Sequence, residues 1–166
     1  ITEKIKKLLL KKRNKIFLNA QINSFNRGYN TVLKYKKINT LVINESELRY
    51  ELRDKYSGVQ KLAKKLSKII SAKNIVVTKG KRGSTFINTK KNSLISCPAF
   101  NKNNIDTIGA GDTFFAILSL VLGSGLDIKI CMLIGSLAAS FSIDQQGKKM
   151  YFDRKTLNKH LKHIFK

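Results

Sequence analysis

The most informative segment of the chain is Asp106-Thr107-Ile108-Gly109-Ala110-Gly111-Asp112, which runs directly into an apolar segment, Thr113 to Leu122, of helical length. Gly109 and Gly111 flank Ala110 and have no side chain, so a ligand can approach the backbone closely. A helix that begins here directs unpaired N–H groups and the positive end of its dipole at one place. The stretch therefore predicts an anion site suited to a phosphate group.

Asp112 falls in the first turn of that helix, beside the predicted anion site. A carboxylate repels a phosphate, so binding alone does not explain this residue. A carboxylate that takes the proton from a hydroxyl group attacking the phosphate would explain it. The alternative is a glycine-rich helix start in which an N-terminal aspartate only stabilises the dipole. The chemistry of the segment leaves both interpretations open.

Composition narrows the class of protein. A length of 166 residues favours one domain, and a hydrophobic content of 42% can build a core. The 33 Lys and Arg against 10 Asp and Glu give a net charge of +23, which invites a nucleic-acid or membrane partner. Lysine far outnumbers arginine, and Asn and Ile are abundant, as an AT-rich coding sequence would give. We therefore interpret the charge as solvated surface, and neither partner is favoured.

The cysteines and the apolar segments indicate the compartment. Cys97 and Cys131 lie far apart without a CxxC spacing, which favours idle thiols in a reducing environment. No uncharged apolar stretch reaches the ~18 residues that a membrane span needs. The basic start lacks the apolar region and the cleavage site of a signal peptide. We expect a cytoplasmic protein without a membrane partner.

The chain alternates candidate strands and helices, which predicts an α/β fold with a largely parallel sheet. Strands are expected over 15–19, 40–43, 74–78, 84–88 and 93–97, and helices over 1–12, 31–37, 45–55, 59–70, 113–122, 128–143 and 157–165. Asn44, with Glu47 three residues later, predicts a capping box at the start of one helix. The helix over 59–70 has one apolar face that we expect to be buried, formed by Val59, Leu62, Ala63, Leu66, Ile69 and Ile70.

Three motifs in the same order resemble the PfkB/ribokinase family of sugar kinases. Asp106–Asp112 resembles its DTxGAGD motif, Thr78–Gly83 its TxGxxG nucleotide turn, and Asn44–Glu47 its NxxE motif. The resemblance covers essentially all of residues 1–166, which would be the C-terminal portion of such a kinase domain. It implies a ribokinase-like three-layer α/β/α fold with a mostly parallel central sheet, with the N-terminal part and the lid missing.

The resemblance also implies chemistry for the first motif. Gly109, Ala110 and Gly111 would form the anion hole for the γ-phosphate of ATP, and Asp112 would be the catalytic base. The reaction would be ATP-dependent phosphoryl transfer to a hydroxyl of a sugar or sugar phosphate. The chain would thus belong to an enzyme, a carbohydrate kinase, although by itself it could be inactive.

The other two motifs would serve the nucleotide and the metal ion. By resemblance, Thr78, Gly80 and Gly83 would line the ATP site, and the alternative for this turn is an ordinary hairpin. Asn44 and Glu47 would order Mg²⁺ and its waters, since hard cations take oxygen ligands. Their alternative, the helix cap, is compatible with that role.

Two further segments refine the resemblance. Ser136 falls where many relatives have an asparagine near the nucleotide, and a hydroxyl cannot offer both sides of an amide. This departure puts the adenine-side contact in doubt. Residues 19–30 and 44–49 resemble a subgroup in which the kinase is fused to a nucleotidyltransferase, related to heptose-phosphate kinase/adenylyltransferases. For residues 19–30, a loop that hydrogen-bonds to itself is the alternative.

Two classes of function remain. The first is the carbohydrate kinase, completed by a homodimer partner or by a missing N-terminal or nucleotidyltransferase part. The second is a catalytically incomplete fragment or a basic module that binds polyanions. Salt dependence of polyanion binding would distinguish the second class from the first.

Overall fold

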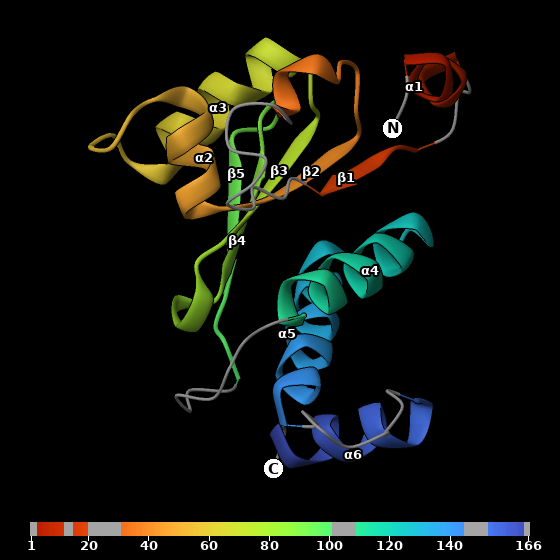
Figure 1. Ribbon diagram of the computed structural model, residues 1–166. Coiled ribbons are helices and arrows are strands. Elements are labelled where there is room, and N and C mark those ends of the chain that lie inside the picture. Colours follow the sequence, from red (N-terminus) through yellow and green to blue (C-terminus); the bar gives the residue numbers. More distant parts are fainter. Residues whose placement is uncertain (1–2, 12–14, 20–30, 101–108, 145–152, 165–166) are drawn as a thin grey trace. The chain divides into compact units, whose positions relative to one another are not determined.

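The computed structural model describes residues 3–11, 15–19, 31–100, 109–144 and 153–164 (Figure 1). The chain divides into two compact units. The first unit consists of Ile1–Lys79 with Thr85–Ile95, and the second of Gly80–Ser84 with Ser96–Lys166. The predicted segment 19–30 lies outside the described residues from Ala20 onward, as do Asp106, Thr107 and Ile108 of the decisive stretch.

The sheet has five strands in the order β1-β2-β3-β4-β5. They are β1 (Phe17–Asn19), β2 (Thr40–Asn44), β3 (Asn74–Thr78), β4 (Ser84–Asn88) and β5 (Ser93–Cys97). β1, β2 and β3 are parallel, with Leu41 opposite Ile75. The Thr89 amide donates to the carbonyl of Lys73, so the end of β4 lies beside the start of β3 and the pair is antiparallel. β3 and β4 thus form one hairpin. The connection between β4 and β5 is also only a few residues long, so these two strands form a second hairpin.

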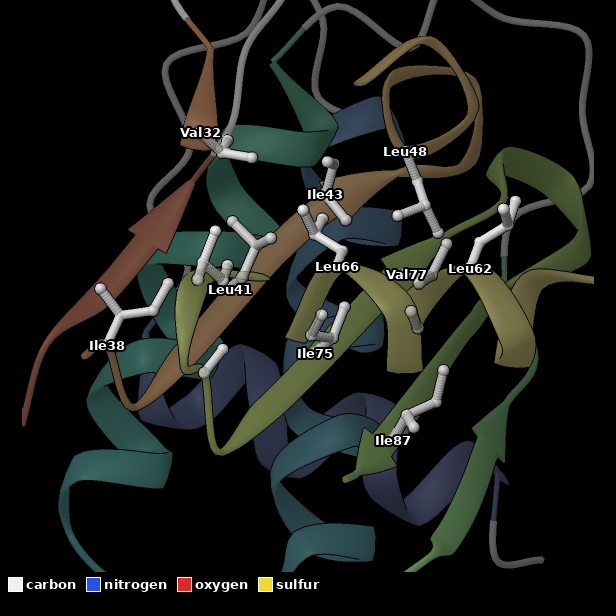
Figure 2. Close-up of a cluster of buried hydrophobic side chains, with 13 residues drawn as sticks. Val32, Ile38, Leu41, Ile43, Leu48, Leu62, Leu66, Ile75, Val77 and Ile87 are labelled. Carbon is white, nitrogen blue, oxygen red and sulfur yellow. The ribbon is translucent and has the colours of Figure 1, made fainter. Parts of the chain in front are cut away.

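Two helices of the first unit, α2 (Glu45–Leu52) and α3 (Val59–Ile70), cover the sheet through one apolar core together with the 3₁₀ turn η1 (Val32–Lys34). α2 contacts β2 and β3, and α3 contacts β3. α1 (Glu3–Lys11) belongs to the same unit, and its Ile5, Leu8 and Leu9 are exposed. Figure 2 shows side chains from η1, β2, α2, α3, β3 and β4 converging on this core. Its fully buried members include Leu41, Leu48, Leu62, Leu66 and Ile75, each 0% exposed.

Several expectations for the first unit were wrong in detail, and the strand expected over 15–19 begins only at Phe17. Residues 31–37 form only the single turn η1, because the backbone returns to the extended region at Tyr35. The helix that begins at Glu45 ends at Leu52 instead of 55, because Arg53 adopts a left-handed conformation (φ 49°). Ile69, expected in the buried face of α3, is 41% exposed, since the buried stripe runs through Leu62, Ala63, Leu66, Ser67 and Ile70.

The second unit is built on a pair of packed helices. Its elements are the 3₁₀ turn η2 (Gly80–Arg82), α4 (Ala110–Gly123), α5 (Ile128–Asp144) and α6 (Arg154–Ile164), and α4 packs against α5. Gly135 permits the contact: a Cβ there would lie 3.3 Å from the Phe114 ring. Leu120, at 69% exposed, shows that α4 also presents apolar surface outward. Among the described helices, none has the length and apolarity to cross a membrane.

Candidate active site

The start of α4 forms the centre of the candidate site, which we call the α4 mouth (Gly109, Ala110, Gly111 and Asp112). Gly109 is the N-cap and adopts φ +83°, a conformation open to glycine. Its carbonyl accepts hydrogen bonds from both the amide and the hydroxyl of Thr113, each at 3.0 Å. The helix begins at Ala110, earlier than the expected start at Thr113, so Gly111 and Asp112 both lie in its first turn and are exposed. The mouth thus presents a carboxylate next to backbone N–H groups that have no intrahelical partner.

Within the described part of the chain, nothing in the fold requires a glycine at Gly111. Its φ is not positive, and a Cβ built there meets no described atom within 4 Å. Glycine inside a helix costs about 1 kcal/mol relative to alanine. At Gly111 there is neither a strained conformation nor a crowded contact that would justify this cost. Free access of a ligand to the backbone would justify it.

The glycine turn (Gly80–Gly83) belongs to the same unit as the α4 mouth. Gly80 and Gly83 have φ of +56° and +78°, and the Gly83 amide donates to the Gly80 carbonyl at 2.9 Å. A Cβ at Gly83 would lie 2.1 Å from the carbonyl oxygen of Cys97 and 2.8 Å from the backbone of Pro98. Gly83 is therefore fixed by packing, whereas Gly80 is exposed with open space at its Cβ position.

Ser136 lies inside the second unit, on α5, and is 8% exposed. Its side chain hydrogen-bonds to the Cys97 thiol. Burial raises the pKa of that thiol, and the bond to Ser136 opposes the shift. The Ser136 side chain is thus engaged with Cys97, whose backbone contacts Gly83. Sequence reasoning missed Cys97, because no local pattern links it to either partner.

Asn44, Glu47 and Thr78 come together in the first unit. Asn44 ends β2 and is the register partner of Thr78, the last residue of β3, so both lie at the carboxyl edge of parallel strands. The predicted capping box is confirmed. The Asn44 side-chain oxygen Oδ1 accepts from the Ser46 backbone amide at 2.8 Å, and the Glu47 carboxylate accepts from the Asn44 backbone amide at 2.9 Å.

The side chains of Asn44 and Glu47 suit a magnesium ion only if they contact the water molecules that the ion carries. A carboxylate can accept about four hydrogen bonds, so the cap does not exhaust Glu47. In the described part of the chain, no three His, Cys, Asp or Glu side chains gather as a metal site. Magnesium keeps several waters in most protein sites. The donor set therefore fits a hydrated ion held at a distance and does not fit a dedicated cage.

A pocket of about 860 Å³ lies elsewhere in the first unit, beside α2. None of the predicted site residues lines it. Arg49 does, and its guanidinium is bound to the Glu45 carboxylate at 2.7 Å and to the carbonyls of Lys55 and Ser57. These bonds tie α2 to the chain that leads into α3, so Arg49 has a structural role in the pocket wall.

The architecture defines a class of fold, the ribokinase-like α/β fold. Ribokinase from Thermotoga maritima superposes with a TM-score of 0.76 at 23% identity, covering 96% of this chain and 53% of that one. Phosphofructokinase-2 from Escherichia coli gives a TM-score of 0.73 at 17% identity, over 99% and 52% of the two chains. The fold predicted from the sequence is confirmed.

The chain belongs to the pfkB family of carbohydrate kinases, whose model matches residues 2–150. The bifunctional protein HldE of Helicobacter acinonychis is 31% identical over 120 residues, which cover 70% of this chain and 26% of that protein. Ribokinase of Bacillus subtilis is 38% identical over 73 residues, 44% of this chain and 24% of that one. The chain thus spans about a quarter of these curated relatives and about half of the solved structures. The family resemblance drawn from the motifs is confirmed.

Proposed function

We propose that this chain is the C-terminal portion of an ATP-dependent carbohydrate kinase and that it carries the phosphoryl-transfer site. Membership of the pfkB family supports the proposal. Two structural neighbours support the substrates: an Arabidopsis thaliana ribokinase is described in complex with ribose and ATP, and phosphofructokinase-2 of Escherichia coli in complex with fructose-6-phosphate. The acceptor for this chain would be a hydroxyl group of a sugar or sugar phosphate.

The observation that carries the proposal is the exposed α4 mouth with its unexplained glycine at Gly111. Backbone N–H groups of Gly109, Ala110 and Gly111 would donate to the oxygens of the migrating phosphoryl group, where charge develops. The carboxylate of Asp112 would accept the proton of the attacking hydroxyl. A bond then forms from the hydroxyl oxygen to phosphorus while the bond between phosphorus and the ADP oxygen breaks.

The nucleotide would lie along the glycine turn. Thr78, Gly80 and Gly83 would line its phosphates and ribose, and the exposed Gly80 permits close approach of the backbone. Asn44 and Glu47 would hold Mg²⁺ through its waters while they also cap α2. When bound, the ion would neutralise charge on the phosphates.

Other parts of a longer protein would complete the site. The family resemblance assigns most sugar contacts and the lid to an N-terminal portion of the kinase. Several relatives bear the name bifunctional protein HldE, which supports a fused second activity, the nucleotidyltransferase of the resemblance. A second copy of the chain is the alternative partner.

The direct test compares Asp112→Asn with Asp127→Asn in a phosphoryl-transfer assay that supplies ATP, Mg²⁺ and a panel of sugars and sugar phosphates. Asp127 is a matched control because it is exposed, in the same unit and at a helix start, where its side chain accepts from the Lys129 amide. We expect Asp112→Asn to lower transfer about 10²- to 10⁴-fold with folding kept, and Asp127→Asn to leave it unchanged.

Equal transfer by the two variants would contradict the role of Asp112. Absence of transfer by the unsubstituted chain, together with heparin binding that falls steeply as salt rises, would favour the polyanion-binding alternative.

A further inference from the structure

We propose that Cys97 and Ser136 form a positioning pair that fastens the glycine turn to α5, so that nucleotide affinity depends on a buried contact that does not touch the nucleotide. The inference rests on the proposed function, because it assumes that the glycine turn binds ATP. All the residues concerned lie in the second unit.

The first link joins the turn to the backbone of Cys97. A Cβ at Gly83 would lie only 2.1 Å from the Cys97 carbonyl oxygen, so the two backbones are in close contact. Pro98, the only proline of the chain, follows immediately. Proline has a fixed φ and confines the residue before it to extended conformations. Cys97 therefore presents a rigid surface to the turn.

The second link joins Cys97 to α5. The Cys97 thiol and the Ser136 side chain share a hydrogen bond, and both residues are 8% exposed. Buried polar groups need hydrogen-bond partners, and here the Cys97 thiol and the Ser136 side chain are partners of each other. Ser84, the residue after Gly83, is 3% exposed, and within the described part of the chain its Oγ has no partner. The Ser84 hydroxyl therefore does not fasten the turn.

The third link joins α5 to the α4 mouth. The ring of Phe114 packs against Gly135, the residue before Ser136. Phe114 follows Asp112 by two residues on α4. Ser136 itself is buried in the same helix. Through Gly135 and Ser136, α5 therefore contacts both α4 and Cys97, whose backbone lies against Gly83.

The test measures binding of fluorescent mant-ADP with Mg²⁺ to Cys97→Ala, Ser136→Ala and the double variant of the full chain. Cys131→Ala is the matched control, because Cys131 is also a buried thiol, at the start of α5, and its sulfur contacts the Leu126 carbonyl instead. We expect each single variant to weaken binding about five- to tenfold, the value of one buried hydrogen bond. The double variant should be no weaker than either, since the pair acts as a unit.

Two further readouts separate positioning from loss of packing. Amide hydrogen exchange of residues 79–84 should be faster in Cys97→Ala and in Ser136→Ala than in Cys131→Ala. In the Cys131→Ala chain Cys97 is the sole thiol, and ADP should slow its reaction with a thiol reagent several-fold.

Wild-type affinity and exchange in both single variants would overturn the inference, and so would labelling of Cys97 that ADP does not change at saturating concentration. The proposed function would survive those results if Asp112→Asn still abolished transfer. Absence of ADP binding by the unsubstituted chain would overturn both.

Discussion

The predicted functional residues of the two units differ in how much of their identity packing explains. In the first unit, Asn44 and Glu47 form a capping box and Thr78 belongs to the β2–β3 ladder, so each has a structural duty. In the second unit, Gly111 and Asp112 are exposed, and Gly111 lowers helix stability without relieving any contact. A residue that acts against stability is stronger evidence of function than one that also serves the fold.

The largest effect is expected in the core of the first unit. Leu66 on α3 is 0% exposed, and Leu66→Ala should lower the free energy of unfolding by about 2–5 kcal/mol through lost burial and a cavity. Urea unfolding measures it, with Lys65→Ala, an exposed neighbour, as the control within about 0.5 kcal/mol. A loss below roughly 1 kcal/mol for Leu66→Ala would mean that the core is looser than its burial indicates.

A smaller effect tests whether Asn44 serves only the helix. Asn44→Ala should cost about 1 kcal/mol of stability, because the start of α2 loses its side-chain acceptor. Asn44→Ser keeps a capping hydroxyl and should restore most of that loss. If Asn44 also orders hydrated Mg²⁺, the serine variant should still need more Mg²⁺ for half-maximal transfer. An unchanged Mg²⁺ requirement would leave Asn44 with the cap alone.

The smallest effect concerns the loop between α2 and α3. The Ser57 amide, and to a lesser extent that of Tyr56, donates to the Asp54 carboxylate and lowers its pKa below the usual range of an aspartate. A depressed native pKa stabilises the fold above the unfolded value, and the contribution disappears as the pH falls through the native value. Asp54→Asn should therefore melt slightly lower than wild type at neutral pH and equally in strong acid. A difference that persists in strong acid would point to a cause other than charge.

Local patterns predicted much of this structure. β-Branched runs gave β3, β4 and β5 with the observed bounds, and Asn44 with Glu47 gave the cap. The motif order gave the family. One error arose where tertiary contacts decide: Ile69 lies on the apolar side of α3, yet it is exposed beside the buried stripe.

The candidate site was predictable only in part for the same reason. The glycine spacing and the apolar helix that follows it predicted the anion site at the α4 mouth. The approach of Cys97 to Gly83 and to Ser136 joins segments far apart in sequence, and no periodicity encodes it. Positioning residues of this kind become visible only when the backbone path is known.

The most direct test of the α4 mouth is Gly111→Ala, with thermal unfolding and phosphoryl transfer measured on the same preparation. Gly123→Ala, at the other end of α4 and with equally open space at its Cβ position, is the matched control. Both variants should gain up to about 1 kcal/mol of stability. Only Gly111→Ala should lose transfer, by at least about hundredfold, because the new methyl group blocks the phosphate from the backbone donors. A Gly111→Ala chain that is more stable and transfers phosphate as fast as wild type would contradict the proposal that phosphoryl transfer takes place at the α4 mouth.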